Sequence, residues 1–125
     1  MTDLNPSNAV AELLRPKGTG PLWGLESSDL NATLLAWPPW HCVAEHINAE
    51  LDVLVIVLEG GGAATVDQCP HTLTPTSALL IEKGSARTIR AGAEGIRYLT
   101  VHRRRGPLQI TGAAEKAEQP PADAR

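Results

Sequence analysis

The chain has 125 residues, which is enough for one apolar core and leaves no room for a second domain of ordinary size. Its formal net charge is −3, from 11 Lys and Arg against 14 Asp and Glu, so the composition gives no reason to expect a nucleic-acid partner, which needs clustered excess cations. The basic run Arg103-Arg104-Arg105 is short and is interpreted as a solvated strand end.

The hydropathy pattern indicates no membrane partner. The longest apolar run, Val53 to Leu58, is too short to span a bilayer, and no N-terminal stretch has the form of a secretory signal. We therefore expect a cytoplasmic protein. Cys42 and Cys69 form no CxxC pair, and without a secretory signal they are expected to be free thiols, with a disulfide between them as the alternative.

The first predicted element is a short helix from Ser7 to Leu14. Ser7 is the expected N-cap, Val10, Leu13 and Leu14 share one face, and Pro16 ends the helix. Residues 1–19 are therefore predicted to form an N-terminal helical segment.

From about residue 20, short runs of Val, Ile, Leu and Thr are separated by turn residues at intervals of roughly ten residues, which is typical of an antiparallel sandwich or barrel. Strands are expected at 21–26, 31–37, 41–48, 52–59, 63–67, 77–82, 86–90 and 96–103. The turns are expected at Pro38-Pro39, at Gly60-Gly61-Gly62, at Cys69-Pro70-His71 and at 91–95. The predicted barrel spans 20–106, and the polar, Pro-rich residues 107–125 are predicted to be a disordered tail.

The predicted strand over Val53 to Leu58 is apolar on both faces. One face must line the barrel, and a second layer or another subunit must cover the other. This pattern predicts a homodimer.

Two stretches resemble the conserved motifs of the cupin superfamily. The first, Ala44 to Gly60 (AEHINAELDVLVIVLEG), resembles the motif in which a His-x-His pair precedes a Glu and a Val-Leu-x-Gly strand end. The second, Ala78 to Arg87 (ALLIEKGSAR), is similar to the motif in which a Pro-x-Gly turn precedes a His. The resemblance covers residues 30–104 and implies an all-β, antiparallel jelly-roll β-barrel, often dimeric, that commonly binds a divalent metal through three His and one Glu.

Most of these ligand positions are replaced in this chain. His46 matches the first ligand, whereas Asn48, Val53 and Arg87 stand at the other three. Valine has no donor atom, and an arginine side chain is cationic at any usable pH and cannot coordinate a metal. No cofactor is therefore expected.

The first hypothesis is a cupin barrel that binds a small anionic molecule. Arg87 supplies a cationic fork suited to a carboxylate or phosphate, and Asn48, Glu50 and His102 are further candidate contacts. His46 is the candidate acid or base.

Two functional alternatives stay open. An atypical metal-binding enzyme of dioxygenase or isomerase type would hold one divalent transition metal by His46 together with Glu50, Asp52 or His102. A non-catalytic binding or accessory module would use the barrel only as a scaffold.

A structural interpretation of the same residues also stays open. Arg87 would then form an internal ion pair with Glu50, Asp52 or Glu82, and His46 would be a hydrogen-bonded interior histidine.

Overall fold

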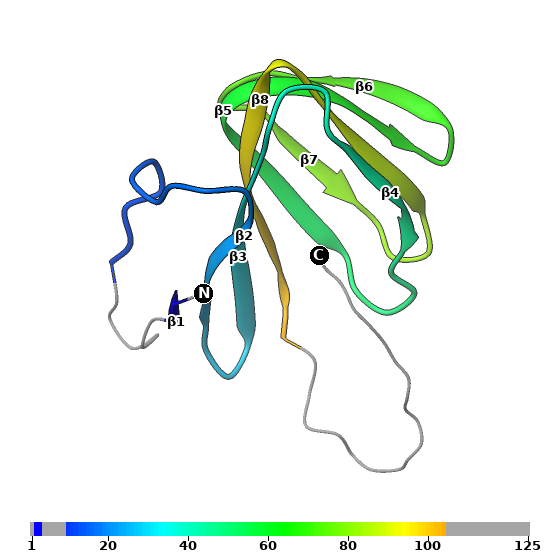
Figure 1. Ribbon diagram of the computed structural model, residues 1–125. Coiled ribbons are helices and arrows are strands. Elements are labelled where there is room, and N and C mark those ends of the chain that lie inside the picture. Colours follow the sequence, from blue (N-terminus) through cyan, green and yellow to red (C-terminus); the bar gives the residue numbers. More distant parts are fainter. Residues whose placement is uncertain (1, 4–9, 105–125) are drawn as a thin grey trace.

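The structure is a computed structural model that describes residues 2–3 and 10–104, and in these residues all regular secondary structure is β-strand (Figure 1). The strands are β1 (Thr2–Asp3), β2 (Gly20–Glu26), β3 (Leu30–Trp37), β4 (Cys42–Ile47), β5 (Val53–Val66), β6 (Cys69–Leu73), β7 (Ala78–Ile81) and β8 (Ala86–Arg103). Apart from the parallel pair β1–β2, the strands pair antiparallel.

Two long strands, β5 and β8, take part in both sheets of the barrel. Residues 53–60 and 96–103 of these strands lie in a first sheet with the order β1–β2–β3–β8–β5–β7. Residues 62–66 and 86–91 lie in a second sheet with the order β4–β8–β5–β6. In Figure 1, β8 can be followed from its start beside β4 to its end beside the β2–β3 hairpin.

Glycines allow the two long strands to bend together. The register shifts between Gly60, opposite Ile96, and Gly62, opposite Ala91. A Cβ at Gly62 would lie 2.0 Å from the carbonyl oxygen of Arg90, so only glycine fits there. The prediction of turns at 60–62 and 91–95 is therefore wrong: both strands continue through these residues, because the glycines permit a bend with paired backbones.

The core lies between the two sheets and is built from the inward faces of both. Val53, Val55 and Val57 of β5 are at most 3% exposed. Burial of this apolar surface is the main term that stabilises the barrel. The buried cluster comprises Leu35, Val53, Val55, Val57, Ala64, Leu73, Ile81, Ile89, Ala91, Ile96 and Tyr98.

The turn predicted at Cys69-Pro70-His71 is wrong, because these residues belong to β6. The hairpin turn is at Asp67-Gln68, where both residues have positive φ, 50° and 69°, as in a type I′ turn. Pro70 is tolerated because β6 is an edge strand, where a missing N–H interrupts no internal ladder.

The predicted N-terminal helix is not seen in the described residues. Residues 10–14 are not helical, while Ser7 to Ala9 lie outside the described part, as does the segment 107–125. Within the described part of the chain, no helix is long and apolar enough to cross a membrane.

Candidate functional site

A bulge in β4 brings His46 to the inner face of the second sheet. Val43 lies opposite Ile89 and His46 opposite Arg87, so three steps along β4 match two along β8. The additional residue places both Val43 and His46 inward, where Val43 packs against the core and the Nε2 atom of His46 is shielded from solvent.

The same bulge turns Cys42 outward. Simple alternation would place Cys42 on the face of His46, but the structure pairs it with the exposed Arg90 on the outer surface. Cys42 and Cys69 are exposed free thiols among the described residues, as the sequence predicted.

Arg87 lies in the middle of the second sheet, between His46 on β4 and Val66 on β5. It shares its face of β8 with the buried Ile89, two residues along. Burial lowers the pKa of the Arg87 guanidinium, and the electrostatic interaction with Tyr98 partly opposes this shift. The cation is thus held partly inside the barrel.

No ion pair to Arg87 is found in the described residues. The ion pairs there are Arg97 with Glu59, at 3.3 Å, and Arg104 with Glu26, at 3.6 Å. The alternative in which a carboxylate of this chain neutralises Arg87 therefore gains no support from residues 10–104.

Aromatic side chains of β3 and β8 contribute to the same interior. The indole Nε1 of Trp37 donates a hydrogen bond to the Tyr98 hydroxyl, at 2.9 Å. The Trp37 ring also stacks on His41, with centroids 4.3 Å apart and planes at 5°. Sequence reasoning did not single out Trp37 or Tyr98; their positions on the inward alternation of two strands were the available signal.

The Asn48 side chain is used in a turn. Its carbonyl oxygen accepts hydrogen bonds from the backbone N–H groups of Glu50 and Leu51, both at 3.0 Å. This is the local bonding by which Asn stabilises a turn, and it explains why Asn48 is only 8% exposed. Glu50 and Asp52 are exposed, and a carboxylate oxygen of Asp52 accepts from the Lys83 N–H at 2.9 Å.

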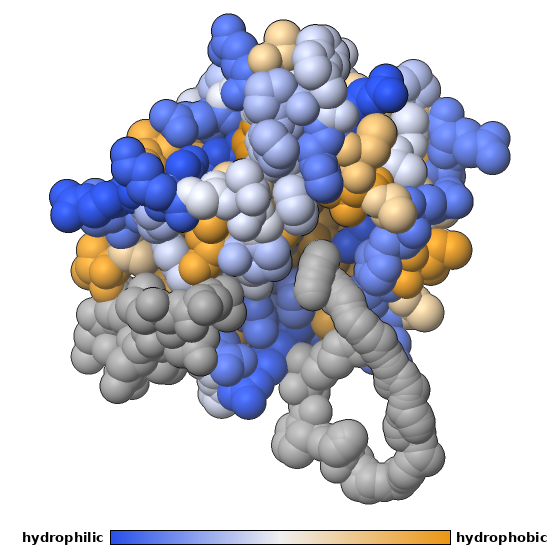
Figure 2. All heavy atoms as spheres, viewed as in Figure 1, coloured by the Kyte–Doolittle hydropathy of each residue, from blue (hydrophilic) through white to orange (hydrophobic). Residues whose placement is uncertain are grey.

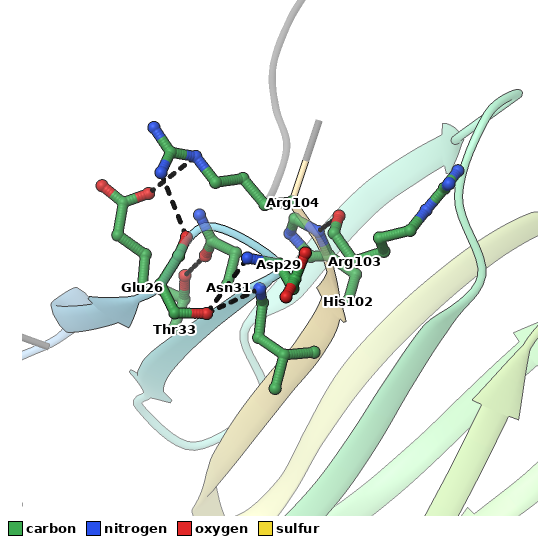
Figure 3. A network of polar contacts seen from close by, with 9 residues as sticks. Glu26, Asp29, Asn31, Thr33, His102, Arg103 and Arg104 are labelled. Atoms are coloured by element: carbon green, nitrogen blue, oxygen red, sulfur yellow. Dashed lines mark hydrogen bonds and ion pairs between the residues drawn. The ribbon is translucent and has the colours of Figure 1, made fainter. Parts of the chain in front are cut away.

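His102 lies at the other end of β8, fifteen positions from Arg87, beside the polar network of the β2–β3 hairpin (Figure 3). Its Nδ1 atom is 2.9 Å from the Arg103 carbonyl oxygen. In the same network Arg104 contacts Glu26 and donates to the Ser27 carbonyl at 3.0 Å. The structure therefore does not bring His102 together with His46.

The comparisons with known proteins identify the fold. No family model matches the chain, and no curated protein does. Among solved structures, BH2720 from Bacillus halodurans is 19% identical, with a TM-score of 0.69 over 90% of this chain and 92% of that one. The cupin domain of Cnp3 from Schizosaccharomyces pombe is 16% identical, with a TM-score of 0.61 over 66% of this chain and 62% of that domain. The cupin protein BF4112 from Bacteroides fragilis is 20% identical, with a TM-score of 0.59 over 74% of this chain and 83% of that one.

The chain has the cupin fold. The prediction of an antiparallel jelly-roll β-barrel is confirmed by the topology and by these neighbours. Identities of this size establish the fold of the barrel and do not extend to its ligand or its activity.

The usual four-ligand metal centre does not fit this cupin barrel. Val53 is a core residue that is 3% exposed, and Arg87, which cannot coordinate a metal, lies opposite His46 in the strand register. In the described residues, no group of three or more His, Cys, Asp and Glu side chains is arranged to hold a metal ion.

What remains inside the cupin barrel is a cation beside an imidazole. Arg87 presents planar N–H donors that match a carboxylate or phosphate, and His46 can accept or donate a proton near neutral pH. The arrangement is therefore suited to anion binding and to proton transfer at the bound molecule.

Proposed function

We propose that this cupin barrel binds a small anionic molecule, held by Arg87 and contacted by His46. The observation that carries the proposal is the partly buried guanidinium, which faces the apolar core and pairs with no carboxylate in residues 10–104. A partly desolvated charge without a counter-charge destabilises the free protein, and a bound anion would offset this cost.

Tyr98, which interacts electrostatically with Arg87, belongs to an ordered group of aromatic side chains. Trp37 is fixed by its hydrogen bond to Tyr98 and by its stacking on His41. Side chains that are locked by such contacts lose little freedom when a ligand binds. His46, opposite Arg87, would be the acid or base in any proton transfer.

The test is a binding titration by calorimetry and thermal shift with inorganic phosphate, succinate and citrate, and with glycerol as the neutral probe. We expect binding of at least one anion and no binding of glycerol. Arg87→Met should weaken binding by at least about tenfold, because it removes a charge-assisted, bidentate contact. Arg87→Lys should have an intermediate effect, because it keeps the charge but not the fork.

Arg90→Met is the matched control, because Arg90 is on the same strand, is exposed and faces outward. It should bind as the wild type does. An equal loss of anion affinity in Arg90→Met would show that binding depends only on the net charge of the protein. Failure of all three anions to bind the wild type would refute the proposal.

Elemental analysis of protein purified without a His tag separates this proposal from the metal-binding alternative. We expect metal well below one equivalent, unchanged in His46→Ala. One equivalent of a transition metal that disappears in His46→Ala would show that His46 belongs to a metal site and would contradict the proposed anion site.

A further inference from the structure

Tyr98 places a hydroxyl group in the core of the barrel. It lies on β8 in the first sheet, opposite Leu35 and Val57, and is 3% exposed. On the outside, in the face shown in Figure 2, hydrophobic residues reach the surface in separate groups among hydrophilic ones. A ligand that contacts the Tyr98 hydroxyl must therefore lie between the sheets, which limits the contacting part to a small group.

The position of the Tyr98 hydroxyl is set by Trp37. The indole Nε1 of Trp37 lies 2.9 Å from the hydroxyl oxygen, and because an indole N–H can only donate, the oxygen is the acceptor. The Trp37 ring is itself held by its stacking on His41, whose carbonyl oxygen accepts from the Ala91 N–H at 2.8 Å. The hydroxyl oxygen is thus fixed through a chain of contacts that reaches back to β8.

The proton of the Tyr98 hydroxyl needs an acceptor that neither Trp37 nor Arg87 can supply. An indole N–H and a guanidinium are donors only, whereas a tyrosine hydroxyl both donates and accepts. Tyr98 also interacts electrostatically with Arg87, so the two groups act on the same part of the interior. An anion held by Arg87 brings an acceptor to both donors.

The two donors come from different walls of the barrel. Arg87 belongs to the second sheet and Tyr98 to the first, and the core lies between these sheets. A carboxylate is planar, and a bidentate guanidinium occupies both of its oxygens from one side. A tetrahedral oxyanion keeps further oxygens outside that plane, where a donor on the facing wall can reach them.

We propose that the Tyr98 hydroxyl donates a hydrogen bond to the anion held by Arg87, and that this contact selects tetrahedral oxyanion groups, such as the phosphoryl group of a phosphate monoester, over planar carboxylates. The inference rests on the anion site proposed above and adds the class of its ligand. Tyr98 is then a specificity-determining residue. Trp37 is a positioning residue, because it acts on the ligand only through Tyr98.

The first test compares methanesulfonate with acetate in calorimetric titrations of the full chain. Each probe has a methyl group and a single negative charge, so they differ in the shape of the anionic group. We expect the wild type to prefer methanesulfonate, and Tyr98→Phe to lower this preference at least about tenfold, because the variant removes a hydrogen bond to a charged group. Trp37→Phe should lower it less, because the hydroxyl remains but its oxygen is no longer held.

The ratio of the two affinities separates selection from a loss of structure, because a distorted barrel weakens both probes together. Thr100→Val is the matched control: it removes a hydroxyl two residues further along β8, on the same face of the strand. This variant should keep the preference of the wild type. Arg87→Met should lose binding of both probes, since it removes the contact that they share.

The second test uses the fact that the chain contains one tyrosine. Protein labelled with 3-fluorotyrosine should therefore give a single fluorine resonance, which reports on Tyr98 without a change at Trp37 or Arg87. We expect inorganic phosphate to shift this resonance with the same midpoint as the calorimetric titration. In Arg87→Met the resonance should stay in place over the same phosphate range.

The outcomes distinguish this inference from the proposed anion site. Equal affinities of the wild type for methanesulfonate and acetate, an unchanged preference in folded Tyr98→Phe, or a fluorine resonance that saturating phosphate does not move would overturn the role of Tyr98 and leave the anion site standing. If no anion binds the wild type, both proposals fail. Should Tyr98→Phe not fold, the fluorine measurement on the wild-type sequence still decides.

Discussion

Arg87 is the residue at which stability and the proposed function oppose each other. Its guanidinium faces the core next to Ile89 and Val66, and burial lowers its pKa. A group that binds a ligand through a buried charge destabilises the free protein, because the charge is desolvated before the ligand arrives.

Arg87→Met should therefore stabilise the ligand-free protein by about 1 kcal/mol, because replacement of a buried charge by an apolar side chain of similar volume is commonly favourable. A lowered pKa means that the folded protein holds this proton less tightly than the unfolded chain does. The destabilisation is then fully present below the pKa of the folded state and is relieved only as pH rises through it. Arginine stays protonated at usable pH, so the gain should be equal at pH 6 and pH 8 in urea denaturation. A loss of stability in Arg87→Met would show that the charge is already compensated.

For single residues, the sequence predicts which residues occupy the motif positions better than it predicts the direction in which their side chains point. The motif positions identified His46 and Arg87, and the register places them opposite each other. The outward direction of Cys42 depends on a bulge, which leaves no distinctive pattern in the sequence. Asn48 could face a ligand or its own backbone, and only the local turn decides between them.

At the scale of elements, the bend shared by β5 and β8 creates the barrel. Gly60 has a φ of 69°, and Gly62 approaches the β8 backbone more closely than any side chain permits. The two strands can therefore leave the first sheet together and enter the second.

Gly62→Ala should destabilise the fold by roughly 3 kcal/mol or more, because the new Cβ would meet the Arg90 carbonyl at 2.0 Å and force the paired strands apart. Gly24→Ala is the matched control in β2: its Cβ would lie 3.4 Å from the Ala32 carbonyl oxygen, near ordinary contact, and the change should be small. Urea denaturation of both variants measures the difference. Similar losses in the two variants would mean that the bend does not depend on this close approach.

Element prediction fails where a residue type has two structural uses. Glycine runs at 60–62 and 91–95 have the composition of turns, yet here they bend continuous strands. Pro70 indicates a turn by its missing N–H, yet an edge strand tolerates it. The strands without glycine or proline in their interior, such as β3 and the first half of β5, were predicted nearly to their ends.

At the scale of the whole molecule, the two sheets are one covalent and hydrogen-bonded unit. β5 and β8 pair with each other in both sheets, and their inward residues belong to a single core cluster. Neither sheet can therefore lose its central pair without removing the centre of the other, so we expect unfolding in one step.

The test uses the position of the tryptophans. Trp23 and Trp37 lie on β2 and β3, and Trp40 follows β3, so fluorescence reports on the first sheet, whereas far-UV circular dichroism reports on both. Ile89→Ala truncates a buried residue of the second sheet and should destabilise the protein by about 2–5 kcal/mol. If the sheets unfold together, this distant change shifts the fluorescence midpoint as far as the dichroism midpoint. Ile47→Ala, at an exposed position of the same sheet, should shift both midpoints only slightly.

A dichroism transition that moves or splits in Ile89→Ala while the fluorescence transition stays in place would show that the two sheets unfold independently. The bend would then be a hinge, and anion binding at Arg87 would be expected to stabilise only the second sheet.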